Sequence, residues 1–522
     1  MLRLFISLLF RLGADQRGAV LIKFTVALLP LLTVVGVAVD VGQVFLVKQK
    51  LTNAVDAAGI AVGRHSELDE DEVKALAQSF VVAHYPATAI GDLKGVTVTA
   101  LEKQVDVTAT ASVPMTFLTI LGYKSVDITA STMVLRQLRK IELVMVLDNS
   151  GSMAGTRMTA LQSSANALIT ALFGSETTSN FVKIGLAPFS SAVNVGAGNA
   201  GADWIDSTGL SILHKEDVDL PLGKTLFDLL GSLTNASWGG CVRARLSGYD
   251  LTDEPPDAGE SLFVPYIAPN EPTGCYVNGK FVLASKFACT GTYLDYANDY
   301  LSNANTVGFT PQQNQRNWLA YVGKTVPAGG TLGPNYNCPA SPIQPLTNVK
   351  STITSAISSM VAYGNTVIPE GIAWGWRVLS PGPPFTEGAP YSDPDTLKFL
   401  ILLTDGENNV GAPGNYHNSS SFSAFGFAAS GHLGNTDGSQ ARAVLDAKTA
   451  TLCGNVKAQG IYLYTIALQV SDSATRKMLE DCATPPADCP GKQCYYNSPT
   501  ASDLETAFTN IALGINKLRV AQ

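Results

Sequence analysis

Three short stretches carry carboxylate and hydroxyl groups at a spacing that can hold a metal ion. Residues 148–152 (DNSGS) directly follow the apolar run 141–147, and residues 404–406 (TDG) follow the apolar run 397–403. A third stretch, residues 364–366 (GNT), precedes a helical pattern. Each stretch alone is more often an ordinary turn or helix cap, because Asp and Ser side chains bond to nearby backbone groups. Because two of the three stretches directly follow predicted buried strands, we consider that they form one metal site together.

The elements around these stretches predict a doubly wound, mainly parallel α/β sheet. Apolar strand-like runs alternate with helical patterns through the second part of the chain. Parallel strands end at one edge of such a sheet, and ligands bind at that edge. Two carboxylates and three hydroxyls there suit Mg²⁺, or else Ca²⁺ or Mn²⁺, and not Zn²⁺. We expect five residues to converge as the metal site: Asp148, Ser150, Ser152, Thr366 and Asp405.

The N-terminal part of the chain predicts a membrane anchor. Residues 1–17 contain three arginines and one acidic residue, and residues 18–39 are apolar except for Lys23. About 20 such residues, each rising about 1.5 Å, can cross a hydrocarbon core of about 30 Å. The positive-inside bias places residues 1–17 in the cytoplasm and the bulk of the chain outside it. The alternative is a signal peptide cleaved near residues 36–38.

Apolar residues continue at three- and four-residue steps to Val62, so we expect one helix over 18–62 that leaves the membrane as an amphipathic helix. Residues 63–138 predict a small α+β subdomain. Residues 139–522 predict the α/β domain, interrupted by an insertion at about 194–345 where the periodicity is lost. The loop 411–440, which follows Asp405, is our expected determinant of partner specificity.

The eight cysteines all lie beyond the apolar segment. None forms a CxxC pair near a histidine, so disulfides in an oxidising envelope compartment are favoured over zinc ligation. Cys453 with Cys482 and Cys489 with Cys494 are two pairings that we consider, although sequence alone does not fix connectivity. The net charge of −8 disfavours nucleic-acid binding. Nothing in the sequence indicates the oligomeric state.

The N-terminal segment resembles TadE/TadG-type pilus-assembly proteins. The matching features are Arg17-Gly18, an apolar run containing Pro30, then Asp40 and an Ala/Asp-rich helix. Type IV pilins carry Glu five residues after the processed glycine, whereas this chain has Lys23 there. The difference favours a retained anchor.

The motifs DNSGSM and TDGEN together resemble the von Willebrand factor A family and its metal-ion-dependent adhesion site. By that resemblance Ser150, Ser152 and Thr366 bind the metal directly, while Asp148 and Asp405 act mainly through water. The stretch GNTVIPEGIAWGWRVLSP, followed by TDGENN, is similar to the A domain of TadG-type proteins. The resemblance implies a single-pass protein of the bacterial inner membrane, periplasmic or surface-exposed, that serves tight-adherence (Flp) pilus assembly. Its metal would capture an acidic side chain on another pilus-assembly or envelope protein.

Two other functions are consistent with parts of the sequence: a structural envelope protein with a fold-stabilising metal, and a metal-dependent hydrolase. A hydrolase needs a base or nucleophile next to the metal. Ser150 has no histidine in its motif, and His417 lies in a loop expected to be solvated. The sequence contains neither a GxSxG elbow nor a Walker A loop. We therefore expect binding rather than catalysis.

Overall fold

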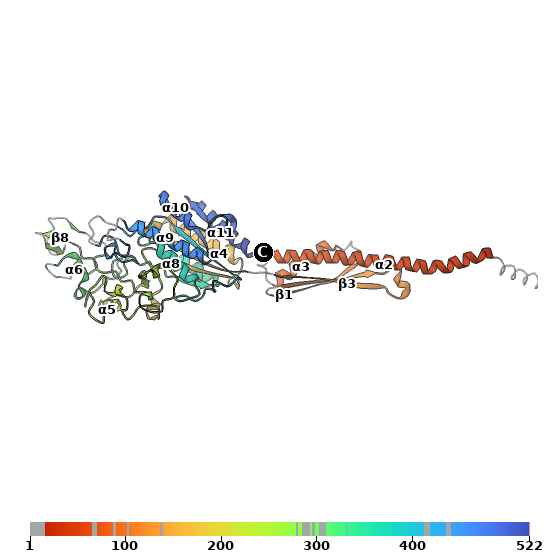
Figure 1. The fold of residues 1–522 in the computed structure, drawn as a ribbon, viewed down its shortest axis with the longest axis horizontal. Helices are drawn as coiled ribbons and strands as arrows, with labels where there is room; N and C mark the ends of the chain where they lie inside the picture. The colour runs from red at the N-terminus through yellow and green to blue at the C-terminus, as the bar shows by residue number, and fades with distance from the viewer. Residues whose placement is uncertain are drawn as a thin grey trace, which may run out of the picture. The chain divides into compact units, whose positions relative to one another are not determined.

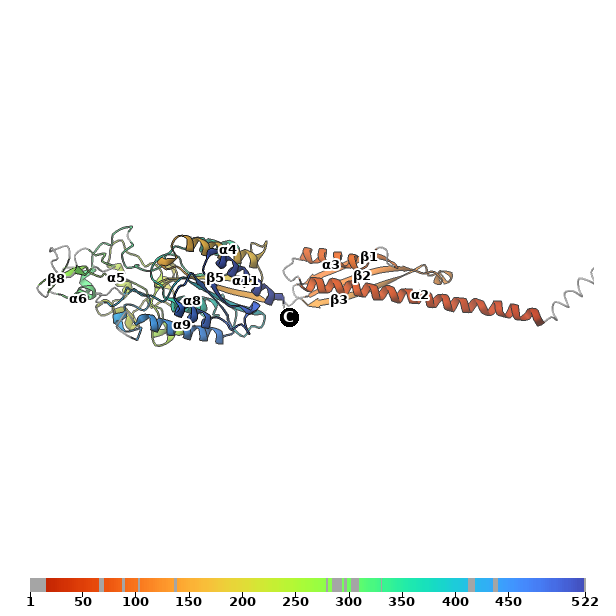
Figure 2. The ribbon, with the colours of Figure 1, turned by 90° about the horizontal axis from the view of Figure 1, so that it is seen from above.

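The computed structural model describes most of the chain, in two compact units. The described residues are 16–64, 70–86, 90–101, 104–135, 139–277, 280–283, 293–294, 298–301, 309–329, 331–411, 418–434 and 440–520. The units are Met1–Leu138 with Gln522, and Arg139–Ala521 (Figures 1 and 2). His417, most of the basic N-terminal segment and two parts of the 411–440 loop lie outside the described residues.

The N-terminal unit is built on one long helix, α2 (Gln16–Arg64), which contains Pro30. One face of α2 is buried from Val47 to Val62, with apolar residues three and four positions apart packed on a small sheet and a second helix. Before Gly36 the described side chains are exposed. Among the described residues, this is the one helix long and apolar enough to cross a membrane. The other elements are α3 (Glu70–His84) and the antiparallel strands β1 (Asp92–Leu101), β2 (Gln104–Pro114) and β3 (Ser125–Leu135), with a short helix η1 (Leu118–Leu121) between β2 and β3.

The second unit is organised by one eight-stranded sheet in the order β14-β13-β12-β4-β5-β6-β7, with β11 paired to β5. Five strands are parallel: β4 (Lys140–Asp148), β5 (Val182–Phe189), β12 (Thr396–Thr404), β13 (Tyr462–Leu468) and β14 (Tyr495–Ser498). Three short strands add antiparallel pairs: β6 (Val193–Asn194), β7 (Cys241–Val242) and β11 (Gln344–Thr347).

Helices cover both faces of this sheet (Figures 1 and 2). Alternate residues of the central strand β4 belong to two separate cores, with Val144 and Val146 in one and Leu143 and Met145 in the other. This division shows that the strand is buried on both faces, as its continuous apolar run predicts. The doubly wound fold class is confirmed. One face carries α4 (Thr156–Phe173), α7 (Lys350–Ser358) and α11 (Ala501–Val520), and the other carries α8 (Ile368–Leu379), α9 (Ala441–Ala458) and α10 (Ser473–Cys482).

Helix α8 lies unusually close to the sheet because it presents glycines to it. A Cβ atom on Gly375 would lie 2.2 Å from Val146, and one on Gly371 would lie 2.6 Å from Phe189. The two glycines are four residues apart, so they share one face of the helix. This close packing fixes the position of residues 364–366, which lead into the helix.

The insertion leaves the sheet after β6 and returns through β11, so its two ends meet. The main-chain oxygen of Asn194 accepts the Ile343 N–H at 2.7 Å, and the Asn194 amide donates to the Pro339 carbonyl at 2.8 Å. The described part of the insertion has helices and strands of its own. These are α5 (Leu226–Gly231), α6 (Pro311–Arg316), β8 (Gly274–Val277), β9 (Lys280–Leu283) and β10 (Tyr293–Leu294), with 3₁₀ turns between them.

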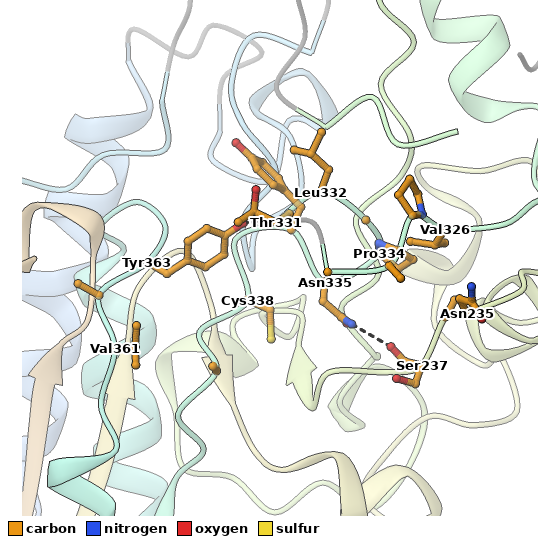
Figure 3. A pocket seen from close by; sticks show the side chains of 18 residues that line it. Asn235, Ser237, Val326, Thr331, Leu332, Pro334, Asn335, Cys338, Val361 and Tyr363 are labelled. Atoms are coloured by element: carbon orange, nitrogen blue, oxygen red, sulfur yellow. Dashed lines mark hydrogen bonds between the residues drawn. The ribbon is translucent and has the colours of Figure 1, made fainter. Parts of the chain in front are cut away.

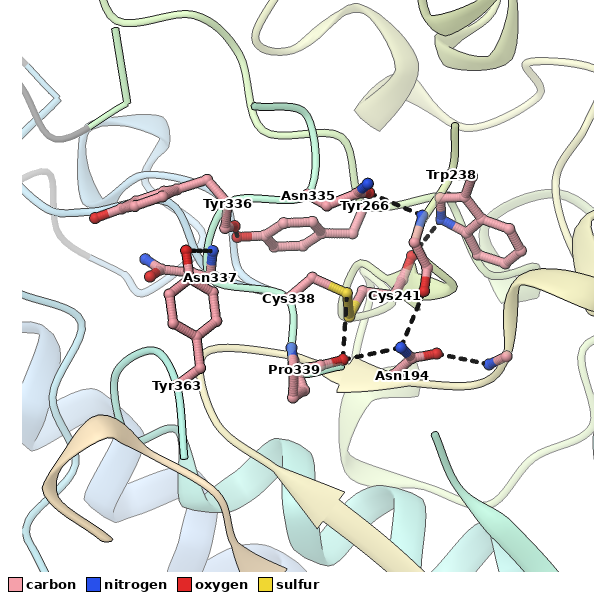
Figure 4. The surroundings of a disulfide bond; sticks show 12 residues. Asn194, Trp238, Cys241, Tyr266, Asn335, Tyr336, Asn337, Cys338, Pro339 and Tyr363 are labelled. Carbon is pink, nitrogen blue, oxygen red and sulfur yellow. Dashed lines mark hydrogen bonds between the residues drawn. A yellow bond between two sulfur atoms is a disulfide. The ribbon is translucent and has the colours of Figure 1, made fainter. Parts of the chain in front are cut away.

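Three disulfides join described residues. The two considered pairs, Cys453–Cys482 and Cys489–Cys494, are both present. A third, Cys241–Cys338, ties β7 to the returning end of the insertion beside Asn194 (Figure 4). The side chains of the remaining cysteines, Cys275 and Cys289, lie outside the described part of the chain. The expectation of a disulfide-bonded domain is confirmed.

Candidate functional site

The candidate site lies where the strand order of the sheet reverses. Strands β4 and β12 are parallel neighbours, with Leu147 in register with Leu403. The chain continues from β4 to β5 on one side and from β12 to β13 on the other. In doubly wound sheets, such a switch point leaves a crevice at the carboxyl ends of the strands. Asp148 ends β4 and Asp405 follows β12, so both carboxylates are at this crevice.

Asp148 is fully buried and held from two sides. Its Oδ1 accepts the Ser150 N–H at 2.7 Å, and its Oδ2 accepts the Thr404 hydroxyl at 2.6 Å. The first bond closes the turn that follows β4, and the second comes from the neighbouring strand. The carboxylate therefore has a fixed orientation before any ligand arrives.

The two serine hydroxyls connect Asp148's turn to Asp405. Ser150 Oγ and Ser152 Oγ lie 3.0 Å apart, and Ser152 Oγ donates to Asp405 Oδ1 at 2.7 Å. Octahedral Mg²⁺ with ligand distances near 2.1 Å requires neighbouring oxygens to be about 2.9 Å apart. The serine oxygens already have this spacing, and the donor set consists of hard oxygens. The residues present therefore fit a small divalent cation.

The segment that carries Thr366 is attached to both strand ends. The Gly151 N–H donates to the Gly364 carbonyl at 2.9 Å. Thr366 exchanges main-chain hydrogen bonds with Asn409, at 3.2 and 2.7 Å, on the segment that follows β12. Gly364 has φ +89°, and a Cβ there would lie 3.0 Å from Ser190 Oγ, so the turn needs glycine. These bonds bring Thr366 to the crevice, while the role of its hydroxyl as a metal ligand stays a prediction.

The negative charges of Asp148 and Asp405 are not fully balanced by nearby positive charge. Burial, followed by the negative charge of Asp405, raises the pKa of Asp148 to about 6. Burial also raises the pKa of Asp405, against the opposing effects of the Ser152 hydroxyl and the Arg157 guanidinium. Two buried carboxylates disfavour each other's ionised form. A bound cation would remove that penalty.

Arg157 is a site residue that the sequence reasoning missed. Its Nη1 donates to Asp405 Oδ2 at 2.9 Å and to the Ser152 carbonyl at 3.0 Å, and its Nε donates to Gln469 at 2.8 Å. Arg157 lies in the first turn of α4, five residues after Ser152. Its position just behind the DNSGS motif was the available signal. About a third of its side chain is exposed, so it can also meet an approaching acidic group.

The specificity loop that we expected over 411–440 is largely buried in its described part. Phe422, Phe425 and Phe427 have at most 5% of their surface exposed, and Phe422 packs on Tyr266 of the insertion. The Gly/Ser-rich composition suggested an exposed loop, but the aromatic residues within the segment pack against the insertion instead of facing solvent. Residues 418–434 therefore support the fold near the site more than they offer a free surface.

A pocket of about 680 Å³ lies next to the site turn (Figure 3). The insertion lines most of it, including Asn335 and Leu332, and Tyr363 lies on the opposite wall. Tyr363 also donates its main-chain N–H to the Asn149 carbonyl at 2.6 Å. One wall of the pocket is thus continuous with the turn that holds Ser150 and Ser152.

The fold and the oxygen-rich switch point define the class of the second unit: an α/β domain with a candidate divalent-metal site. Among the described residues no group of three or more His, Cys, Asp and Glu could hold a metal, so the site depends on hydroxyls beside its two carboxylates. At the other end of the chain, residues 18–65 match a family described as putative Flp pilus-assembly TadE/G-like. This match confirms the resemblance drawn from the N-terminal segment. No curated protein matches the sequence.

Several solved structures are similar at low identity. The pilus adhesin SpaC from Lactobacillus rhamnosus GG is 13% identical with a TM-score of 0.31; the match covers 81% of this chain and 33% of the adhesin. The von Willebrand factor domain of a type V pilus tip protein from Porphyromonas gingivalis is 10% identical with a TM-score of 0.32, covering 73% and 96%. Proximal thread matrix protein 1 from the mussel byssus, with a zinc-occupied MIDAS motif, is 13% identical with a TM-score of 0.29, covering 72% and 48%. This chain spans about a third of the adhesin's length and about half of the byssus protein's.

Proposed function

We propose that this protein is a membrane-anchored pilus-assembly protein of the cell envelope that captures an acidic side chain on a partner through a divalent metal ion. The family match at residues 18–65 supports the assignment to pilus assembly. The apolar N-terminal part of α2 supports the membrane anchor, with the second unit outside the cytoplasm. The disulfides support an oxidising compartment, such as the periplasm or the cell surface.

One observation carries the proposal: Asp148 accepts the Ser150 N–H, and the Ser150 hydroxyl is linked through the Ser152 hydroxyl to Asp405. In the proposed site the two serine hydroxyls and Thr366 bind the cation directly, and Asp148 and Asp405 hold its waters. Mg²⁺ is the favoured ion, with Ca²⁺ and Mn²⁺ as alternatives. A metal held mainly by neutral hydroxyls keeps much of its positive charge. It can therefore accept a carboxylate from a partner.

The same contacts favour binding over hydrolysis. Ser150 Oγ, the one nucleophile proposed from the sequence, is bonded to Ser152 Oγ, which in turn donates to Asp405. In a nucleophilic enzyme the serine would instead bond directly to a base. A fold-stabilising metal is the remaining alternative, and it predicts that metal removal changes stability without changing partner recovery.

A pull-down from envelope extract tests the proposal. The full chain is used as wild type, as Asp148→Ala and as Glu387→Ala, each with Mg²⁺ and with chelator. Glu387 is an exposed acid two residues from Ala389, whose N–H bonds to the opposite end of β4, and serves as the matched control. We expect a partner that wild type and Glu387→Ala recover only with Mg²⁺, and that Asp148→Ala never recovers.

Equal recovery in all lanes would show that the metal does not mediate partner binding. Thermal unfolding of the same samples distinguishes partner binding from the alternative, a metal that only stabilises the fold. A large metal-dependent gain in stability with unchanged recovery would assign the metal to the fold alone.

A further inference from the structure

The connection between β2 and β3, residues 115–124, has an unusual surface. Phe117, Ile120 and Tyr123 are 42%, 82% and 62% exposed. The stretch 115–123 contains no charged residue, and Lys124 ends it. The other hairpin of this antiparallel sheet connects through Glu102 and Lys103. One end of the sheet therefore has a polar connection and the other end a large apolar one.

This apolar connection, which we call the β2–β3 loop, is fastened to the end of the predicted membrane span. The carboxylate of Asp40 accepts the main-chain N–H groups of Thr116, Phe117 and Leu118 at 3.0, 2.8 and 2.7 Å. The Phe117 ring lies directly on Gly36, where a Cβ would approach it to 2.6 Å. Both ribbon views show the hairpin end beside the middle of α2, with the helix continuing past it (Figures 1 and 2).

Most main-chain N–H groups of the β2–β3 loop bond within the protein. Besides the three groups bonded to Asp40, the Met115 N–H donates to Lys124, the Ile120 N–H to Phe117 and the Tyr123 N–H to Leu118. The Thr119 hydroxyl donates to the Met115 carbonyl at 2.8 Å. Lipid offers no hydrogen-bond partners, so a segment that lies in it must pair its main-chain groups within the protein and expose apolar side chains. The β2–β3 loop has this character. A loop tip that faces water needs no such arrangement.

The depth of the loop follows from helix geometry. The predicted span ends at residue 39, and Gly36 lies three residues before that end, about 4.5 Å within the span. Phe117 is therefore level with the boundary between lipid headgroups and acyl chains. Tyr side chains favour this boundary, and a lysine can extend its ammonium group to the phosphates from it. Tyr123 and Lys124 at the base of the loop match that preference.

The geometry points to the β2–β3 loop as a second membrane contact: Phe117, Ile120 and Tyr123 insert into the lipid headgroup region beside the span, and Asp40 holds the loop there. The inference rests on the membrane anchor of the proposed function. Its occupant is the lipid surface, because the loop continues the apolar surface of the span. Two contacts would restrict the tilt and rotation of α2, which a single helix leaves free.

Depth-dependent fluorescence quenching tests this inference on the full chain in phosphatidylcholine proteoliposomes. Single cysteines replace Ile120, Val34 in the span, or Ile60, which is 58% exposed and about 39 Å further along α2 than Val34. Each is labelled with bimane without reductant, and the unmutated chain is labelled in parallel as a blank. We expect nitroxide lipids to quench the labels at Ile120 and Val34 several-fold more than the label at Ile60, and iodide to quench mainly Ile60.

The outcomes separate the loop from the anchor. If Val34 is quenched by lipid and Ile120 behaves like Ile60, the β2–β3 loop is in water and the inference is wrong. If Val34 also escapes lipid quenching, the predicted span itself fails. Efficient disulfide cross-linking of two Ile120→Cys chains in detergent and in lipid would assign the loop to a contact between copies and overturn the lipid assignment.

A second variant tests the role of Asp40 without touching the apolar residues. Asp40→Asn weakens the acceptor of three N–H groups, so amide exchange at Thr116–Leu118 should accelerate several-fold and lipid quenching at Ile120 should fall. Asp56→Asn, an exposed acid on the same helix, is the matched control. Unchanged exchange in Asp40→Asn would show that Asp40 does not hold the loop.

Discussion

A carboxylate is buried at each end of strand β4, and the two carboxylates differ in their charged neighbours. Glu142, at the amino end, pairs with Lys398 Nζ at 2.5 Å, and its two oxygens accept the Ala389 N–H at 3.0 Å. Lys398 is itself buried and also donates to the Leu379 carbonyl at 2.8 Å. Asp148, at the carboxyl end, receives bonds from a main-chain N–H and a hydroxyl, and its charged neighbour is Asp405.

This difference separates a structural carboxylate from one that is ready for a ligand. A buried ion needs a partner, because desolvation of an unpaired charge costs several kcal/mol. Glu142 pairs with the buried Lys398 of strand β12 and, at 3.6 Å, with the half-exposed Lys183 of strand β5, so its charge is balanced. Asp148 accepts a hydroxyl from Thr404 and Asp405 accepts one from Ser152, and of these two carboxylates only Asp405 contacts Arg157. The same two strands, β4 and β12, thus build a closed ion pair at one end and, at the other, an open site that we propose for a cation.

The largest effect is expected from breaking the closed pair. Lys398→Met leaves the buried Glu142 with only the half-exposed Lys183 ammonium, 3.6 Å away, so the free energy of unfolding should fall by up to about 3–5 kcal/mol. Urea unfolding of the full chain measures this. In the double variant Glu142→Gln/Lys398→Met no buried charge remains, and most of the lost stability should return. If the single and double variants were equally unstable, the lysine would serve packing rather than charge.

Loss of a hydroxyl from the open site should abolish most metal binding while the fold is kept. Ser152→Ala removes a proposed ligand and the bond to Asp405, so Mg²⁺ affinity should fall by about 100-fold or more, beyond the loss typical of an outer-sphere partner. Titration calorimetry measures the affinity. The variant Ser502→Ala, at an exposed position in α11, should bind Mg²⁺ as wild type does. Wild-type affinity in Ser152→Ala would remove Ser152 from the site.

The open site should also make the metal-free protein sensitive to pH. The folded-state pKa of Asp148, about 6, lies above the unfolded value near 4, so its contribution to stability is present below about pH 4 and lost as the pH rises to about 6. Asp148→Asn should remove up to about 1.4 kcal/mol per pH unit of this dependence.

Asp217, Glu370 and Glu271 also have pKa values raised by burial, to about 6, 7 and 8, and contribute in the same direction. The measurement is therefore the difference between wild type and Asp148→Asn in urea unfolding, from pH 3.5 to 7.5. Saturating Mg²⁺ should reduce that difference, since it favours ionised Asp148. Parallel pH profiles for the two proteins would contradict the raised pKa.

The smallest effect concerns Arg157, which brings a partial positive charge to the open site. Arg157→Gln should raise Mg²⁺ affinity by about two- to fivefold, as expected for one partly exposed charge, and more at low salt. Arg476→Gln, whose guanidinium bonds to the Val470 and Ser471 carbonyls, is the control. A loss of affinity in Arg157→Gln would mean that the arginine chiefly orients Asp405.

Sequence patterns were sufficient to predict the sheet and to place the residues of the candidate site at one edge of it, because both depend on local order along the chain. An apolar run followed by DNSGS predicts a buried strand and its carboxyl end, and parallel topology then brings Asp148 near Asp405. The helix starting after residue 366 follows from Pro369 near its first turn. These inferences need no knowledge of side-chain conformation.

The features that sequence missed depend on contacts between distant parts of the chain. The bond from Thr404 to Asp148 requires the relative register of two strands, and the Arg157 contacts require a particular side-chain conformation at a helix start. The Cys241–Cys338 pair spans 97 residues, and nothing local distinguishes it from other pairings. The burial of Phe422 and Phe425 likewise depends on an insertion whose fold has no periodic pattern.

The Cys241–Cys338 bridge has a mechanical consequence if the protein is attached, as proposed, to both a membrane and a partner. A pulling force cannot extend the chain enclosed by a disulfide, so the 97-residue separation withholds about 330 Å of contour length from stretching. The tension would instead pass through the disulfide, from β7 to the returning end of the insertion. Under load the residues between the two cysteines could not be drawn out, whereas the chain outside the bridge could.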